Sequence, residues 1–410
     1  MYGIHKNQHK KPKQNRWIAL GTHRIRGHAS DFGNTAPWRL PRELARIKPT
    51  RHPGVPKEQQ SVSASIPSTG YRQAIRSLTQ QVQALETKLP LKHPDCRSRF
   101  WLHDQPTQRV CLLFHGFTAA PYQFIPMGEA LYRAGYNVLA PLLPGHGRAG
   151  KWNGSNPPPL PTDPKVYQQF GLEWLAKARS LGKQVSIGGL SGGGTLAAWL
   201  AQERPQEVYR SILYAPYLSS SSKVVDLFVS KMQGYFTWGK GAEANTFDRP
   251  GYGGFALPAL ATMLTMGKQV LDRADRQLTA PTFVISSQSD QAVGNWDHRA
   301  LWEDTRKRQP ITWQLMFNRV LDIPHTMMTQ EEGNRYASLL VTLTQAFIES
   351  SLTWSEIEAI ARRMMNSETF MDAVTKLRLT DRVSPQMPAA MTLFDKRAFA
   401  MKDLLGDTPD

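Results

Sequence analysis

The chain has 410 residues, of which 40% are hydrophobic and 20% charged, and its formal net charge is +17. This composition allows a sizeable buried core, so the chain need not be disordered. With only two cysteines, Cys96 and Cys111, the chain cannot have a disulfide framework or a zinc site made of four cysteines. No apolar run approaches the ~18 residues that cross a bilayer, and no apolar signal-peptide segment follows the N-terminal charges. We therefore expect a cytoplasmic protein.

Residues 1–65 are predicted to form a basic, largely irregular N-terminal arm. Within residues 1–60, thirteen Lys or Arg and three Asp or Glu give a net charge of +10. The segment has no sustained hydrophobic period, and Pro and Gly interrupt it. Positive charge of this density attracts polyanions and anionic membrane surfaces. We expect weak contact with such partners through residues 1–60 and no specific nucleic-acid site.

An amphipathic helix is predicted next, within residues 66–96. Apolar side chains recur there at spacings of three and four residues, which puts them on one helix face; they are Ile75, Leu78, Val82, Leu85 and Leu89. The run is only about three heptads long, which is short for a coiled coil. We therefore expect this helix to dock on the domain that follows.

Residues 97–350 alternate short apolar runs with helical patterns. This alternation is typical of an α/β domain with a mostly parallel central sheet and helices on both faces. The strands are predicted at 100–102, 110–114, 137–141, 184–188, 211–214, 282–286 and 312–320, and the helices at 122–134, 165–180, 195–202, 295–308 and 334–349.

Residues 219–280 interrupt the alternation with an insert rich in Met and aromatic residues. An insert of this size at the carboxyl edge of a sheet usually forms a cap or lid. Its apolar side chains indicate either a pocket for a hydrophobic group or the small core of the cap itself. The candidate pocket residues are Phe228, Met232, Tyr235 and Phe236. Residues 351–410 show helical patterns without strands and are expected to form a C-terminal extension.

The strongest chemical signal is a Gly-x-Ser-x-Gly motif at residues 189–193, with Ser191 at its centre. The motif follows a predicted strand and precedes a predicted helix, which is the context of a nucleophile elbow. The tight turn raises the serine hydroxyl above the sheet edge, and the flanking glycines let the strand and the helix approach closely. Ser191 is therefore the candidate nucleophile. The alternative is a glycine-rich turn without chemistry.

Two backbone N–H groups are candidates for binding an oxyanion. The turn at Ser191 points the N–H of Gly192 toward the reacting oxygen. His115, Gly116 and Phe117 directly follow an apolar strand, and a loop in that position supplies the second donor, the N–H of Phe117. In this interpretation His115 is a structural residue of the loop. The alternative is an ordinary turn at a strand end.

A serine nucleophile needs a base and a carboxylate that orients the base. In this architecture they follow the serine in the order acid, then histidine. Asp290 and His325 each lie on a loop after a predicted strand, so we expect Asp290 to orient His325. Asp297 and Asp304 are competitors for the acid role, whereas His298 falls inside a predicted helix and suits the role of base poorly.

Residues 145–150 match the Gly-x-Gly-x-x-Gly pattern of dinucleotide-binding sites. Such a site needs a helix N-terminus next to the pyrophosphate. The chain instead continues into residues 151–156 and then three prolines at 157–159, where no helix can start. The sequence also contains no Walker motif and no zinc-type spacing of ligands. No cofactor and no metal are therefore expected.

Together these residues resemble the α/β-hydrolase superfamily, in particular its carboxylesterase and monoacylglycerol-lipase-like branch, which also contains serine peptidases. The matching pieces are residues 112–118, the Pro-Gly-His-Gly run at 144–147, the Ser191 motif, Asp290 with Val293, and His325. The resemblance covers roughly residues 97–350, and it implies the fold, the triad and an oxyanion hole from Phe117 and Gly192. Two departures are Gly194, a third glycine after the serine, and Pro324, where a small residue is more usual.

The motifs and the resemblance predict a serine hydrolase that splits a small-molecule carboxylic ester through an acyl-enzyme on Ser191. The apolar insert suggests that the acyl or the alcohol part is hydrophobic. The same machinery cleaves amides and thioesters, so a serine peptidase, an amidase or a thioesterase is an alternative. A non-catalytic binding protein on a hydrolase scaffold is a second alternative, which the intact set of Ser191, Asp290 and His325 disfavours. The sequence makes no prediction of the oligomeric state.

Overall fold

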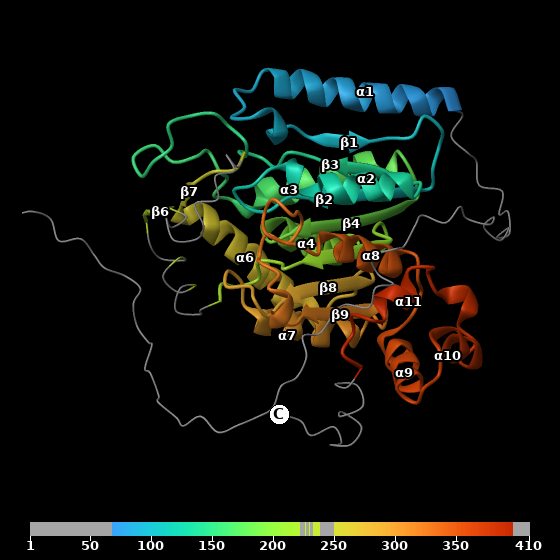
Figure 1. Cartoon of the computed structure of the whole chain (residues 1–410). Helices are drawn as coiled ribbons and strands as arrows, with labels where there is room; N and C mark the ends of the chain where they lie inside the picture. Colours follow the sequence, from blue (N-terminus) through green and yellow to red (C-terminus); the bar gives the residue numbers. More distant parts are fainter. Residues whose placement is uncertain (1–67, 222–225, 227–228, 230–232, 238–249, 397–410) are drawn as a thin grey trace, which may run out of the picture. The chain divides into compact units, whose positions relative to one another are not determined.

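The computed structural model describes residues 68–221, 226, 229, 233–237 and 250–396, and all of them fall in one structural unit (Figure 1). The expected basic arm at residues 1–65 lies outside the described residues, and so do the candidate pocket residues Phe228 and Met232. None of the helices in this described part is long and apolar enough to cross a bilayer.

Within the described residues, the central sheet has seven strands: β1 (Arg99–Trp101), β2 (Arg109–Phe114), β3 (Asn137–Ala140), β4 (Gln184–Leu190), β5 (Arg210–Tyr214), β8 (Thr282–Ser287) and β9 (Thr312–Phe317). Their order across the sheet is β1-β3-β2-β4-β5-β8-β9. β1 pairs antiparallel with β3, and the other pairings are parallel. The strands β2, β3, β4, β5 and β8 are almost continuously buried, as in a parallel sheet covered on both faces. The α/β fold class predicted from the alternating pattern is therefore confirmed.

The main helices around the sheet are α1 (Ser68–Thr87), α2 (Ile125–Arg133), α3 (Pro164–Arg179), α4 (Gly192–Glu203), α6 (Leu257–Ala274), α7 (Asn295–Arg306) and α8 (Ala337–Ile348), with short 3-10 turns η2 (Pro94–Cys96), η3 (Pro121–Phe124) and η4 (Arg319–Leu321). The crossovers β2–α2–β3 and β4–α4–β5 run in opposite directions along the sheet. Right-handed connections therefore put α2 and α4 on opposite faces (Figure 1). α2 packs against α8, while α3, α4, α6 and α7 pack in a row.

Helix α1 contacts the core with a face slightly rotated from the predicted one. Ile75, Leu78 and Val82 pack against the core, whereas Leu85 is 64% exposed. Glu86 turns inward instead, and its carboxylate accepts a hydrogen bond from the N–H of Ser98 at 3.1 Å. A buried carboxylate with such a partner can replace an apolar residue on the inner face, which the hydrophobic pattern alone does not reveal.

The expected cap range, residues 219–280, contains a short strand pair and the long helix α6. β6 (Tyr235–Thr237) pairs antiparallel with β7 (Gly254–Ala256). Strands of three residues are too short to show an alternating pattern, so the sequence does not predict them. α6 packs against α4, and its Met263 and Met266 belong to the main core. This part of the insert therefore helps to cover the sheet.

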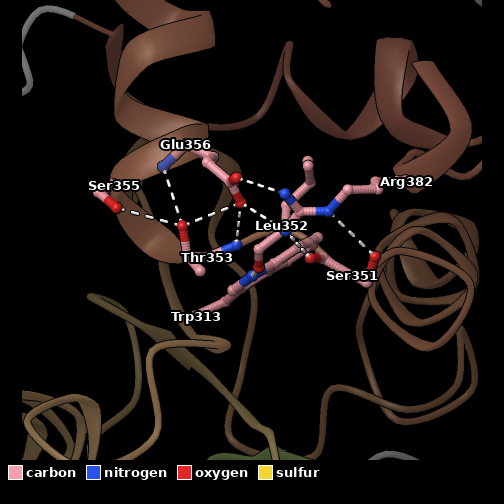
Figure 2. A network of polar contacts seen from close by, with 7 residues as sticks. All are labelled: Trp313, Ser351, Leu352, Thr353, Ser355, Glu356 and Arg382. Carbon is pink, nitrogen blue, oxygen red and sulfur yellow. Dashed lines mark hydrogen bonds and ion pairs between the residues drawn. The ribbon is translucent and has the colours of Figure 1, made fainter. Parts of the chain in front are cut away.

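The C-terminal helices α9 (Trp354–Met365), α10 (Phe370–Lys376) and α11 (Met387–Ala390), with the 3-10 turn η5 (Thr380–Arg382), contribute side chains to the same core as the sheet. Figure 2 shows how the segment before α9 is anchored. Trp313 of β9 donates its indole N–H to the carbonyl of Leu352 at 2.8 Å. Glu356 pairs with Arg382 at 2.5 Å and forms a capping box with Thr353. The described part of the extension is thus anchored to the outermost strand of the sheet.

Candidate active site

Ser191 occupies the sharp turn between β4 and α4. Its φ of +54° is a left-handed value that costs a non-glycine residue about 1–3 kcal/mol, so neighbouring groups must hold it. The N–H of Ser191 donates to the carbonyl of Tyr214 at 2.9 Å. The carbonyl of Ser191 accepts from the N–H groups of Thr195 at 2.9 Å and Tyr217 at 3.1 Å. These contacts fix the serine in a strained turn at the carboxyl end of a central strand, as the elbow motif predicts.

The glycines around Ser191 are required by close backbone contacts. A Cβ on Gly189 would lie 2.2 Å from the carbonyl oxygen of Gly193, and a Cβ on Gly193 would lie 2.1 Å from that of Phe114. The third glycine, Gly194, is confined less tightly, because its Cβ would lie 2.9 Å from the carbonyl oxygen of Gly189. Gly194 therefore fits the same tight crossing of strand and helix.

The two candidate oxyanion residues are neighbours at the start of α4. A Cβ built on Gly192 would lie 3.3 Å from the Cβ of Phe117 and 3.1 Å from the Sδ of Met263. The N-terminus of a helix favours negative charge, so this is a suitable place for a developing oxyanion. Met263, whose side chain lies against Gly192, is buried. Sequence reasoning did not select Met263 as a site residue; its place in the apolar insert was the only signal.

Asp290 and His325 form an acid–histidine pair. The Nδ1 of His325 lies 2.7 Å from the Oδ2 of Asp290. Because a carboxylate only accepts, Nδ1 is the donor in this contact, and the tautomer that fits it has its lone pair on Nε2. The Oδ1 of Asp290 accepts from the N–H groups of Ala292 at 2.8 Å and Val293 at 3.3 Å. Burial alone would raise the pKa of Asp290, but His325 and the Ala292 N–H outweigh it and hold that pKa below its usual value.

The two competing acids have other partners. Asp297 accepts a hydrogen bond from the hydroxyl of Ser219. Asp304 forms a partly exposed ion pair with Lys307 at 2.5 Å. Of the three acids considered from the sequence, Asp290 is the one that the structure pairs with a histidine.

All three candidate triad residues lie at one edge of the sheet. Ser191 follows β4, Asp290 follows β8 and His325 follows β9. These strands are parallel, so their carboxyl ends share an edge. The structure thus gathers at this edge the residues that the sequence assigns to nucleophile, acid and base.

His298 is a buried histidine that contacts the backbone near Ser191. It is buried on α7, as its helical position in the sequence suggests, and its Nε2 donates to the carbonyl of Pro216 at 2.7 Å. The next residue, Tyr217, holds the carbonyl of Ser191. Burial lowers the pKa of His298 more than the charge of Asp290 raises it, so the ring is neutral. His298 therefore acts as a structural link rather than as a base.

Two buried histidines hold the loops after β2 and β3 together. His115 accepts the N–H of Leu143 on Nε2 at 3.0 Å. His146 accepts the N–H of Thr118 on Nε2 at 3.2 Å, and its Nδ1 donates to the carbonyl of Pro144 at 2.9 Å. Burial lowers the pKa of both rings, that of His146 to about 4. Both histidines are neutral structural residues, as the sequence predicts for His115.

The described candidate pocket residues, Tyr235 and Phe236, lie on β6. Phe236 is 44% exposed, and its ring centroid lies 5.4 Å from that of Phe255. Phe255 in turn contacts the ring of Phe117 at 5.1 Å. A separate small core surrounds Phe255 and includes Leu160, Tyr252 and Ala259. Residues of the insert therefore share this small core with the loop that carries Leu160, and the exposed Phe236 lies beside Phe255 of that core.

Among the residues that the structure describes, no three His, Cys, Asp or Glu side chains gather closely enough to hold a metal ion. Cys96 and Cys111 are both buried, with free thiols. Burial raises the pKa of each thiol, which makes a poor nucleophile because the thiolate is the reactive form. The groups that can support covalent chemistry at the sheet edge are therefore Ser191 and its neighbours.

Comparison with known proteins finds similarity over parts of this chain. The thermostable monoacylglycerol lipase of Bacillus sp. (strain H-257) is 37% identical over 103 residues, which are 23% of this chain and 35% of the lipase. This chain therefore matches about a third of that lipase's length. A solved structure from the metagenome-derived lipolytic enzymes LipS and LipT is 19% identical, with a TM-score of 0.49 over 62% of this chain and 98% of its own. The monoacylglycerol lipase of Paleococcus ferrophilus is 17% identical, with a TM-score of 0.47 over 60% of this chain and 96% of its own.

The family comparison covers more of the chain. The sequence profile described as alpha/beta hydrolase fold matches residues 110–328, which is more than half of the 410 residues. The matched region includes Phe117, Ser191, Asp290 and His325. The observed sheet is mostly parallel, as described above. The resemblance seen in the sequence is thereby confirmed: the chain belongs to the alpha/beta hydrolase fold family.

Proposed function

We propose that this protein is a serine hydrolase that cleaves carboxylic esters through an acyl-enzyme on Ser191. The observation that carries the proposal is the 2.7 Å contact between the Nδ1 of His325 and the Oδ2 of Asp290, at the sheet edge where Ser191 is held in its strained turn. A buried acid that orients a histidine, together with a serine on a tight turn, is the arrangement that activates an alcohol as a nucleophile.

In the proposed reaction, the Nε2 of His325 takes the proton of the Ser191 hydroxyl while the serine oxygen attacks the ester carbonyl carbon. The N–H groups of Phe117 and Gly192 stabilise the resulting oxyanion. Asp290 stabilises the imidazolium, which then gives its proton to the departing alcohol. Water attacks the acyl-enzyme after giving a proton to His325, and the acid is released as His325 returns that proton to the serine oxygen.

Apolar side chains close to the oxyanion residues support an ester with an apolar acyl chain. Met263 lies against Gly192, and Phe255 packs on the ring of Phe117. The segment that is similar to a monoacylglycerol lipase supports the same substrate class. A monoacylglycerol or a comparable simple ester is therefore the substrate we propose.

The test is a panel of p-nitrophenyl esters of increasing acyl length and a monoacylglycerol, with matched amides and thioesters. Wild-type protein should hydrolyse esters, and Ser191→Ala should lower kcat by about 10⁶-fold. Ser186→Ala is a matched control, because Ser186 is buried on β4, the strand that leads to Ser191. In the described part of the chain its hydroxyl has no hydrogen-bond partner. The control should keep wild-type turnover. Preference for amides or thioesters would replace the ester assignment, and full activity of Ser191→Ala would refute the mechanism.

A further inference from the structure

The phenol of Tyr252 is hydrogen-bonded to the loop that follows β3. Tyr252 belongs to the cap segment just before β7 and is 5% exposed. Its hydroxyl donates to the carbonyl of Gly145 at 2.7 Å and accepts the N–H of Arg148 at 2.8 Å. Burial raises the pKa of Tyr252 to about 12, so the hydroxyl keeps its proton and can make both contacts. The phenol therefore closes the loop that carries His146.

The backbone of the same residue holds the loop that carries Phe117. The N–H of Tyr252 donates to the carbonyl of Thr118 at 2.8 Å. Thr118 has a φ of +66°, a strained value for a non-glycine residue, and its N–H is held by His146 at 3.2 Å. The carbonyl of Thr118 is therefore bonded to the insert, and its N–H is bonded to the loop that contacts the phenol of Tyr252.

The cap segment is itself anchored at this place. The thiol of Cys96 donates to the carbonyl of Pro250 at 3.4 Å, and the ammonium of Lys92 donates to the carbonyl of Gly251 at 2.9 Å. A Cβ on Gly251 would lie 2.5 Å from the carbonyl oxygen of Thr118, so the two backbones are in direct contact. The position of the loop after β2 therefore depends on a segment more than 130 residues away in the sequence.

We infer that Tyr252 is a positioning residue that sets the place of the Phe117 N–H in the oxyanion hole. This inference rests on the proposed function, in which that N–H stabilises the oxyanion. Phe117 immediately precedes Thr118, and its ring contacts those of Phe255 and His146 at centroid distances of 5.1 and 6.1 Å. Loss of the Tyr252 hydroxyl frees the carbonyl of Gly145 from its bond and releases the His146 loop.

The chain offers a matched control for a change of Tyr252 to Phe. Tyr167 lies in the same cluster, with its ring 6.3 Å from that of His146, and is fully buried. In the described part of the chain its hydroxyl has no hydrogen-bond partner. Tyr252→Phe and Tyr167→Phe therefore each remove one buried hydroxyl beside His146, but only the first removes two hydrogen bonds.

The experiment measures kcat, KM and melting temperature for the full chain and both variants with p-nitrophenyl butyrate, and the affinity of a trifluoromethyl ketone that forms an oxyanion on serine. Tyr252→Phe should lower kcat about tenfold to hundredfold with KM within about twofold, because a displaced donor affects the transition state more than substrate binding. The affinity for the ketone should fall by the same factor as kcat/KM. Tyr167→Phe should stay within about twofold of wild type in every measurement.

Equal kcat for Tyr252→Phe and wild type, or a loss of melting temperature alone, would overturn the inference and leave the proposed function intact. A wild-type protein that hydrolyses no ester would remove the proposed function itself. If Tyr252→Phe does not fold, Gly251→Ala replaces it, since the added methyl group pushes directly on the Thr118 carbonyl. Unchanged kcat and unchanged ketone affinity in Gly251→Ala would then overturn the inference.

Discussion

The replacement of Asp290 by Asn tests how the acid controls the histidine. In the structure the Oδ1 of Asp290 accepts two backbone N–H groups, from Ala292 and Val293, and Oδ2 faces His325. An asparagine must keep its oxygen toward the two N–H donors, so its NH₂ group must face Nδ1 of the ring. Because NH₂ only donates there, Nδ1 must become the acceptor and the proton moves to Nε2.

A histidine with the proton on Nε2 cannot accept the proton of Ser191. A wrong tautomer of this kind lowers kcat by about 10⁴-fold in serine proteases, which corresponds to about 5 kcal/mol of transition-state stabilisation. We expect a similar loss in kcat for Asp290→Asn with KM changed little, measured at saturating p-nitrophenyl ester. The melting temperature should change by only a few degrees, because the side chain keeps its size and its two backbone hydrogen bonds.

Asp297→Asn is the matched control, since Asp297 also follows β8 in the chain but accepts a hydrogen bond from Ser219. It should retain turnover within about threefold, as expected for a substitution outside the catalytic hydrogen bonds. Turnover of Asp290→Asn within tenfold of wild type would refute the tautomer argument. A large loss in Asp297→Asn together with an active Asp290→Asn would move the acid role to Asp297.

Three further predictions concern stability and specificity. First, burial lowers the pKa of His146 to about 4, below its unfolded value of about 6.5. The free energy of unfolding should therefore be highest above about pH 6.5 and should fall as the pH decreases toward 4, because the unfolded chain then binds a proton that the buried ring does not. Urea unfolding at pH 7 and pH 4.5 should differ by at least about 2–3 kcal/mol, and equal free energies of unfolding would contradict a neutral buried His146. Second, Trp354 is buried against Trp302 and Phe394, so Trp354→Ala should lower the free energy of unfolding by about 3–5 kcal/mol; a loss below about 1 kcal/mol would show that the C-terminal helices contribute little. Third, Phe236 is 44% exposed, so Phe236→Ala should change the preference for acyl length with a melting temperature within a few degrees, and an unchanged preference would exclude Phe236 from the pocket.

The fold class and the main parts of the site could be predicted because their signals are local. Parallel strands that are buried on both faces give continuous apolar runs, and the turn around Ser191 requires glycines at positions that a short motif records. The order of serine, acid and histidine along the chain, together with a position on a loop after a predicted strand, favoured Asp290 and His325, and the structure brings these two side chains to 2.7 Å. Their roles in catalysis stay predictions until the variants are measured.

Other features could not be predicted because they depend on contacts between distant segments. Leu85 belongs to the apolar pattern of α1, but Glu86 takes the inner position because Ser98 supplies its hydrogen bonds. The contact between Tyr252 and Thr118 joins two loops without periodic sequence. Met263 comes to lie against Gly192 only when α6 packs on α4. In each case tertiary packing brings together two residues that are distant in the chain, and the sequence around neither residue indicates the contact.

The most direct test of the central claim is to locate the covalent adduct of a fluorophosphonate by intact mass and peptide mapping. We expect one adduct per chain, located on Ser191 and absent from Ser191→Ala. Labelling should be strongly slowed in His325→Ala, because the serine then lacks its base. An adduct on a different residue, or full labelling of Ser191→Ala, would contradict the assignment of Ser191 as the nucleophile.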